Sequence, residues 1–104
     1  MTDDTITREV FLAFVRVHIL HHAAEGPVFG LEMIEELRRH GYSIGPGTLY
    51  PILHKLESAA CLRSKEQIVN GKRRKNYVAT AKGRRALAAV RKQIRELSNE
   101  VLEA

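Results

Sequence analysis

The sequence predicts a mainly α-helical fold with one small β-hairpin and a long C-terminal helix, and three observations predict it. Apolar residues recur at helical spacing in three segments before residue 60. An Asn-Gly pair between two short strand-like runs then indicates a hairpin. A final segment repeats apolar residues at alternating spacings of three and four. With 104 residues and neither a linker nor a repeat, the chain is expected to fold as one compact unit.

The first two helices are predicted from their end signals. The first covers about Thr7 to Ala24, and Gly26 with Pro27 ends it because both residues disfavour a continuing helix. The second covers about Gly30 to His40, with basic side chains in its last turn, where they complement the helix dipole. Gly41 then supplies the left-handed residue that closes a helix.

A third helix is predicted to begin at Pro46, since a proline in the first helical position loses no backbone hydrogen bond. Its apolar stripe runs from Leu49 to Leu56 and would face the core. Pro51 lies further in, where a proline costs stability, so we expect this helix to matter for its outer surface. That outer surface is formed by Thr48, Tyr50, Pro51, His54 and Lys55.

The hairpin is predicted from two strands, Leu62–Val69 and Arg74–Ala79, on either side of a tight turn. Asn70 and Gly71 form this turn, because both residue types tolerate the positive φ of a type I′ turn. Four consecutive cations follow the turn and would lie at the exposed end of the ribbon: Lys72, Arg73, Arg74 and Lys75.

The last helix is predicted to begin at a Thr80 cap and to carry a heptad seam for two heptads. An ordinary helix packed on its own core would show the same pattern, but so small a domain has little core left to cover. We therefore predict that this helix joins two copies of the chain into a homodimer. The seam residues are Leu87, Val90, Ile94, Leu97 and Val101.

Positive charge is concentrated in one third of the chain. The net charge is +5, and residues 62–95 hold twelve Lys and Arg against one acid, Glu66. Such a density attracts a polyanion, which favours nucleic acid as a partner. The sequence has no Gly-rich phosphate loop, paired-cysteine zinc pattern or nucleophile elbow. We therefore expect no cofactor and no enzymatic activity.

A helix pair with a short Gly-containing turn, followed by a basic hairpin, is typical of a winged helix-turn-helix. Residues 1–80 would form this DNA-binding domain, and residues 81–104 would form the dimerisation helix. A helix fits the major groove of double-stranded DNA, and a projecting ribbon can reach the backbone or the minor groove. We expect His54 and Lys55 to reach base edges and the wing cations to hold the flanking backbone. Thr48 and Tyr50 would contact phosphates, which position a protein without specifying sequence.

Three stretches resemble the PadR-type transcriptional regulators: Gly47–Glu57 with its Gly-Thr-Leu-Tyr-Pro run, Ala24–Pro27, and the wing stretch Arg74–Gly83. The resemblance covers about residues 8 to 102 and favours the short branch, with a single C-terminal helix. It implies a dimeric repressor whose interface can hold a small apolar effector. The chain departs from the family pattern at Phe29, Leu31, Ala60 and Asn76, and the family usually has a glycine where Ala60 stands.

A twofold dimer predicts a pseudo-palindromic operator whose half-sites are about one helical turn apart, or a whole number of turns. One alternative is an architectural DNA-binding protein without sequence preference. Another is a metal- or ligand-sensing regulator with His18 and His22 as ligands, since these residues are four apart on one helix. The simpler interpretation makes His18, His21 and His22 ordinary helix residues without an acidic partner, so we expect no metal.

Three features favour a cytoplasmic protein. Cys61 is the single cysteine and cannot form an internal disulfide, which fits a reducing compartment. The acidic Asp3 and Asp4 are unlike the basic start of a secretory signal. No apolar run reaches the roughly 18 residues of a membrane span, so we expect no membrane association.

Overall fold

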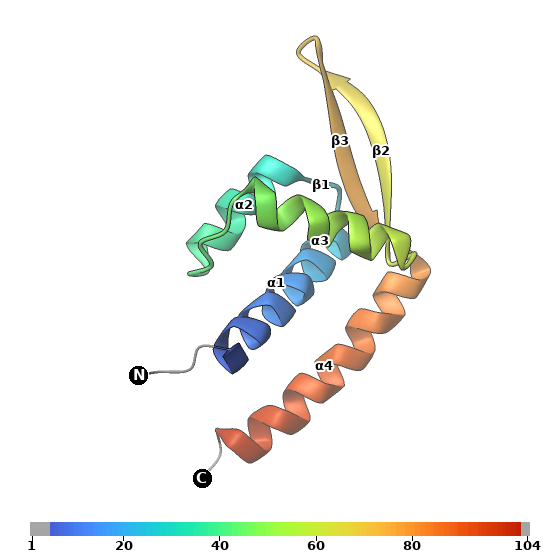
Figure 1. Ribbon diagram of the computed structural model, residues 1–104. Helices are drawn as coiled ribbons and strands as arrows, with labels where there is room; N and C mark the ends of the chain where they lie inside the picture. Colours follow the sequence, from blue (N-terminus) through green and yellow to red (C-terminus); the bar gives the residue numbers. More distant parts are fainter. Residues whose placement is uncertain (1–4, 103–104) are drawn as a thin grey trace.

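A computed structural model describes residues 5–102 of the protein and confirms the mainly helical fold with a basic ribbon. Asp3 and Asp4 lie outside the described residues. Two long helices lie side by side, and the ribbon projects beyond the helical body (Figure 1). In chain order the elements are α1 (Thr5–Glu25), β1 (Val28–Phe29), α2 (Gly30–Arg39), α3 (Pro46–Ser58), β2 (Leu62–Val69), β3 (Lys72–Ala79) and α4 (Ala81–Val101).

The predicted helix ends are confirmed at three positions. Gly41 closes α2 with a φ of +89°, and the amide of Tyr42 donates to the carbonyl of Leu37, as in a Schellman motif. Pro46 lies in the first turn of α3. The Thr80 hydroxyl accepts the amide of Gly83 at 3.0 Å and thereby caps α4.

The hairpin forms around the predicted turn, with Leu62 opposite Ala79 and Val69 opposite Lys72. Asn70 and Gly71 have φ values of 53° and 76°, so both turn residues adopt the positive φ that the sequence predicts. β3 begins at Lys72 and not at Arg74, because a two-residue turn allows pairing to start at once. The strand is therefore two residues longer than predicted.

A third strand, β1, was not predicted. Val28 pairs with Tyr77 and Phe29 pairs with Asn76, which makes a sheet of order β1-β3-β2. Two residues are too short to show the alternation that identifies a strand in sequence. The strand attaches the start of α2 to the base of the ribbon, so that the helical body and the wing are connected at this point.

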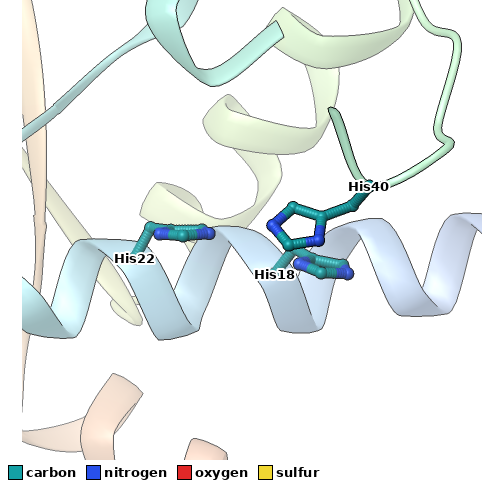
Figure 2. A group of neighbouring side chains, drawn as sticks. All are labelled: His18, His22 and His40. Atoms are coloured by element: carbon teal, nitrogen blue, oxygen red, sulfur yellow. The ribbon is translucent and has the colours of Figure 1, made fainter. Parts of the chain in front are cut away.

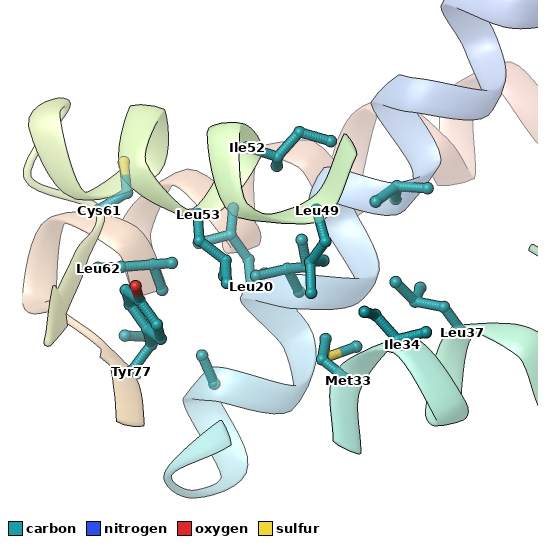
Figure 3. Packing of buried hydrophobic residues seen from close by; sticks show 14 of the residues in the cluster. Leu20, Met33, Ile34, Leu37, Leu49, Ile52, Leu53, Cys61, Leu62 and Tyr77 are labelled. Atoms are coloured by element: carbon teal, nitrogen blue, oxygen red, sulfur yellow. The ribbon is translucent and has the colours of Figure 1, made fainter. Parts of the chain in front are cut away.

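The core lies where α1, α2, α3 and the base of the ribbon meet (Figure 3). Its fully buried members include Ile19 of α1, Leu37 of α2, and Leu49 and Leu53 of α3. α4 contributes far less, and Leu87 is its one large side chain in the core cluster of residues 5–102. No helix of the described part of the chain is long and apolar enough to cross a membrane.

Candidate nucleic-acid interface

The outer face of α3 presents the side chains that the sequence predicts there. Pro51, His54 and Lys55 are exposed, whereas Thr48 and Tyr50 are half-buried. Tyr50 packs against the first residue of α2, since a Cβ added to Gly30 would collide with the Tyr50 ring. This close approach needs glycine at position 30, and it fixes the Tyr50 ring between α2 and α3.

The wing cations do not all have the same environment. Lys72, Arg73 and Lys75 are exposed, but Arg74 is half-buried. The Arg74 guanidinium lies 4.1 Å above the centre of the Phe29 ring and donates to the carboxylate of Glu32 in α2. Stacking and ion pairing therefore occupy this cation, and they hold the wing against the start of α2. The expectation that all four cations are exposed is wrong for Arg74.

The structure brings one residue of the outer face of α3 and the wing together at one groove. Tyr50 of α3 and three wing residues, Arg73, Arg74 and Lys75, line a groove of about 230 Å³ with residues from the start of α2. Arg73 also lies 3.7 Å from Glu66 across the ribbon, but both side chains are exposed, so solvent screens this pair. One predicted DNA-contacting residue of the helix, Tyr50, thus lines the same groove as three predicted residues of the wing.

Two polar contacts that the sequence analysis missed hold the ribbon in place. The Glu57 carboxylate at the end of α3 accepts from the Ser64 hydroxyl at 2.5 Å and from the Ser64 amide at 3.2 Å. The hydrogen bond from the hydroxyl lowers the pKa of Glu57 below its usual value of 4.5. Across the strands, the buried Asn76 donates to Gln67 at 2.7 Å. Residues seven and nine apart in sequence give no local signal for such contacts.

Tyr77 lies fully buried beneath this region, in the core at the base of the ribbon. Burial raises the pKa of its phenol above the usual 10.0. Its hydroxyl has no hydrogen-bond partner among residues 5–102. The ring therefore serves packing, and β3 is anchored at this point by apolar burial.

The predicted seam of α4 divides into two parts. Leu87 is buried in the core of its own chain, which corrects its assignment as a contact to a partner. Val90 is half-buried, and the remaining members are increasingly exposed, at 42% for Ile94, 56% for Leu97 and 64% for Val101. Between α1 and α4 lies an apolar groove of about 450 Å³, with Phe14, Val17, Cys61 and Ile94 among its lining residues.

The histidines of α1 are not without partners. Glu25 lies 3.6 Å from His21, four residues further along the helix, so the expectation that no acidic residue stands beside them is wrong. His18 and His22 instead turn toward His40, which caps the end of α2 (Figure 2). Burial lowers the pKa of His18 below its usual 6.5, and the nearby imidazoles of His40 and His22 lower it further.

The fold and this surface define the class of winged helix-turn-helix proteins, with α3 as the second helix of the motif and the β-ribbon as the wing. The family model of PadR-like transcriptional regulators matches residues 19–89. The chain belongs to this family, which confirms the resemblance seen in the sequence. It is thus a transcriptional regulator of the PadR family.

Known relatives cover nearly the whole chain. It is 50% identical over 95 residues to the transcriptional regulator Rv3488 of Mycobacterium tuberculosis, across 91% of this chain and 89% of the relative. A PadR family regulator of Eggerthella lenta matches with a TM-score of 0.82 and 30% identity, over 97% of this chain and 92% of that one. The smu.1704 structure from Streptococcus mutans matches with a TM-score of 0.80 and 29% identity, over 86% and 84%.

Proposed function

We propose that the protein acts in the cytoplasm as a homodimeric, sequence-specific DNA-binding repressor. One observation carries the proposal: Tyr50 on the outer face of α3 and the wing cations Arg73, Arg74 and Lys75 line the same groove. A helix of this size fits the major groove, and a basic ribbon beside it can follow the flanking phosphates. Family membership supports DNA as the partner.

Different side chains would contact the base edges and the phosphate backbone of the DNA. His54 and Lys55 are exposed on α3 and would reach base edges, with Pro51 packed against the groove wall. Thr48 and Tyr50 are half-buried, and their hydroxyls suit phosphate contacts that fix the register. The exposed wing cations Lys72, Arg73 and Lys75 would hold the backbone. Arg74 would act indirectly, by positioning the wing on α2.

Dimerisation would use the exposed apolar faces of α1 and α4. Phe14 of α1 is 43% exposed, and together with Ile94, Leu97 and Val101 it forms an apolar surface that a second copy can cover. Burying such side chains is worth about 1.5–3 kcal/mol each when burial is complete. In this division residues 1–80 carry the DNA-binding surface, and residues 81–104 join the two copies together with the Phe14 face of α1. A twofold dimer would then meet a pseudo-palindromic operator.

The apolar groove between α1 and α4 supports release by a small apolar effector. Its volume of about 450 Å³ lies within the range of small-molecule pockets, roughly 300–1,000 Å³. Its lining includes Val90, Ile94 and Leu97, which also belong to the proposed dimer surface. An effector bound there would change how the two copies meet, and with it the distance between their recognition helices.

Selection of bound duplexes from a random pool tests this function. We expect enrichment of a pseudo-palindrome with short half-sites about one turn apart. A pool that stays random while the protein still binds would favour the architectural alternative and overturn sequence-specific recognition. Inserting half a turn between the selected half-sites, at constant salt, should reduce affinity toward the non-specific level. Equal affinity at every spacing would contradict binding by a rigid dimer.

A further inference from the structure

Three histidines from two elements meet on one side of the helical body (Figure 2). His18 and His22 lie one turn apart on α1, and His40 comes from the cap residue that ends α2. One ring nitrogen from each residue lies within 4.8 Å of those of the other two. The centres of the His18 and His40 rings are 4.9 Å apart. Nothing in the local sequence of α1 indicates the third member, which is eighteen residues further along.

The surroundings hold this cluster in place but leave it open to solvent. His18 and His22 are half-buried, and the Tyr42 ring packs edge-on against His18 at 4.9 Å. The Schellman turn around Gly41 directs the chain back toward α1 and so fixes the position of His40. His40 itself is 48% exposed, which gives an ion a route in and gives this side chain freedom to rotate.

We propose that His18, His22 and His40 form a site for a divalent transition cation of the zinc class, which would tie α1 to the end of α2. Imidazole nitrogen is a preferred ligand of zinc, copper and nickel, and three histidines leave a position for water or a further ligand. Glu36 lies 3.5 Å from His40 and would orient that ring from outside the ligand shell. Tetrahedral zinc needs ligand nitrogens about 3.3 Å apart, so the rings must move closer on binding.

A second set of residues, His21, His22 and Glu25, is the direct competitor because it shares His22. The environment of His21 disfavours a cation, since the Arg91 guanidinium lies 3.2 Å from its Nδ1. Glu25 is 66% exposed and is therefore well solvated. The first set has three imidazoles and the Glu36 carboxylate beside it, and this combination favours the first set.

Zinc titration of the tag-free protein against a competing chelator dye tests the site, with no DNA present. His40→Gln removes a ligand of the proposed site, and His21→Gln is its matched control, because the two side chains are 48% and 42% exposed. We expect His40→Gln to weaken zinc binding more than about tenfold. His21→Gln should stay within about twofold of the wild type. Circular dichroism would confirm that both variants fold.

Zinc should also raise the thermal midpoint of the wild type and of His21→Gln, but not of His40→Gln, because a ligand that binds only the folded state stabilises it. Loss of zinc in His21→Gln with retention in His40→Gln would locate the ion at the competing set and overturn the proposal. A wild type that does not compete with the dye would overturn it as well. The proposal is independent of DNA recognition, so the failure of either leaves the other standing.

Discussion

The ribbon end of the molecule and the end formed by α1 and α4 (Figure 1) differ in the kind of side chain that they expose to solvent. At the ribbon end, specific polar contacts such as Glu57 with Ser64 and Arg74 with Glu32 fix the elements, and exposed charge remains. At the other end, α1 and α4 expose apolar side chains, including Phe14, Leu97 and Val101. Exposed charge suits a polyanion, whereas an exposed apolar strip suits another protein surface. The two ends are thus built for different partners.

The largest effect is expected from charge at the apolar end. Ile94→Glu would place an unpaired carboxylate in the proposed seam, where burial without a partner is costly. We expect the dissociation constant of the dimer to rise at least about a hundredfold, which corresponds to about 2.8 kcal/mol. DNA affinity should fall with it, because each monomer would meet only one half-site. Light scattering over a concentration series measures the first effect.

Asn99→Glu is the matched control, since it adds the same charge on an exposed part of α4 away from the seam. It should leave the dimer intact. If the protein with Ile94→Glu still dimerises as the wild type does, the exposed apolar strip of α4 is not the dimer interface. The proposed contrast, in which the ribbon end binds DNA and the other end binds a second copy, would then be wrong.

The next effect distinguishes base recognition by α3 from backbone binding by the wing. Lys55→Ala on α3 should cost about 1–3 kcal/mol on the selected operator and relax the preference at one base position. Lys72→Ala on the wing should weaken binding similarly on all sequences and reduce the salt slope by about one. Binding isotherms at several salt concentrations, on the operator and on random duplex, distinguish the two. A preference lost in Lys72→Ala would mean that the wing also reads bases.

A smaller effect tests whether polar contacts hold the ribbon. Glu57→Gln removes the charge that accepts from Ser64, and we expect a loss of about 0.5–1 kcal/mol of stability at pH 7, because the site is half-buried. The folded-state pKa of Glu57 is lowered, so this contribution is present above the usual pKa of 4.5 and is lost as pH falls through the folded-state value. The gap in unfolding free energy between the wild type and Glu57→Gln should therefore close at acidic pH.

Urea denaturation at pH 7 and at a pH below the folded-state pKa measures that gap. In a Ser64→Ala background the gap at pH 7 should shrink, because the hydroxyl donor is gone. A gap that is the same at both pH values would show that the carboxylate charge does not fasten the ribbon, and apolar burial of Tyr77 would then be its main anchor.

Sequence predicts most of this fold because most of its elements end at local signals. Gly41, the Asn70 and Gly71 turn and Thr80 each adopt the backbone geometry or the capping contact expected of their residue type. The candidate interface is predicted only in outline. Which face of α3 turns outward follows from periodicity, but the Arg74 contacts do not, since its neighbours in sequence are cations of the same kind.

What the sequence could not predict depends on contacts between distant residues. Strand β1 exists because Val28 meets Tyr77, and the histidine cluster exists because the turn after α2 returns His40 to α1. The sequence correctly predicts an apolar seam on α4, but the spacing alone does not distinguish Leu87 from Leu97. Leu87 is buried in the core of its own chain, whereas Leu97 is exposed. That division depends on where the core ends.

The smallest effect concerns the turn that joins α3 to the ribbon. Ala60 ends α3 with a φ of +63°, in the left-handed region that costs a residue with a Cβ roughly 1–2 kcal/mol. The Cys61 amide donates to the Leu56 carbonyl at 2.9 Å, which completes a Schellman motif whose usual residue is glycine. Relief of this strain is partly offset, because glycine makes the unfolded chain more flexible.

Ala60→Gly should therefore raise stability by about 0.5 kcal/mol, which urea denaturation can resolve when both proteins are measured together. Ala59→Gly is the matched control, since Ala59 is also exposed but has a φ of −80°, where glycine only adds flexibility to the unfolded state. It should lower stability by a similar amount, so the two neighbouring changes are expected to have opposite signs. If both lower it, the left-handed turn is not strained. The turn would then join α3 to the ribbon without strain, and the position of the wing would depend on other contacts, among them those of Glu57 and Arg74.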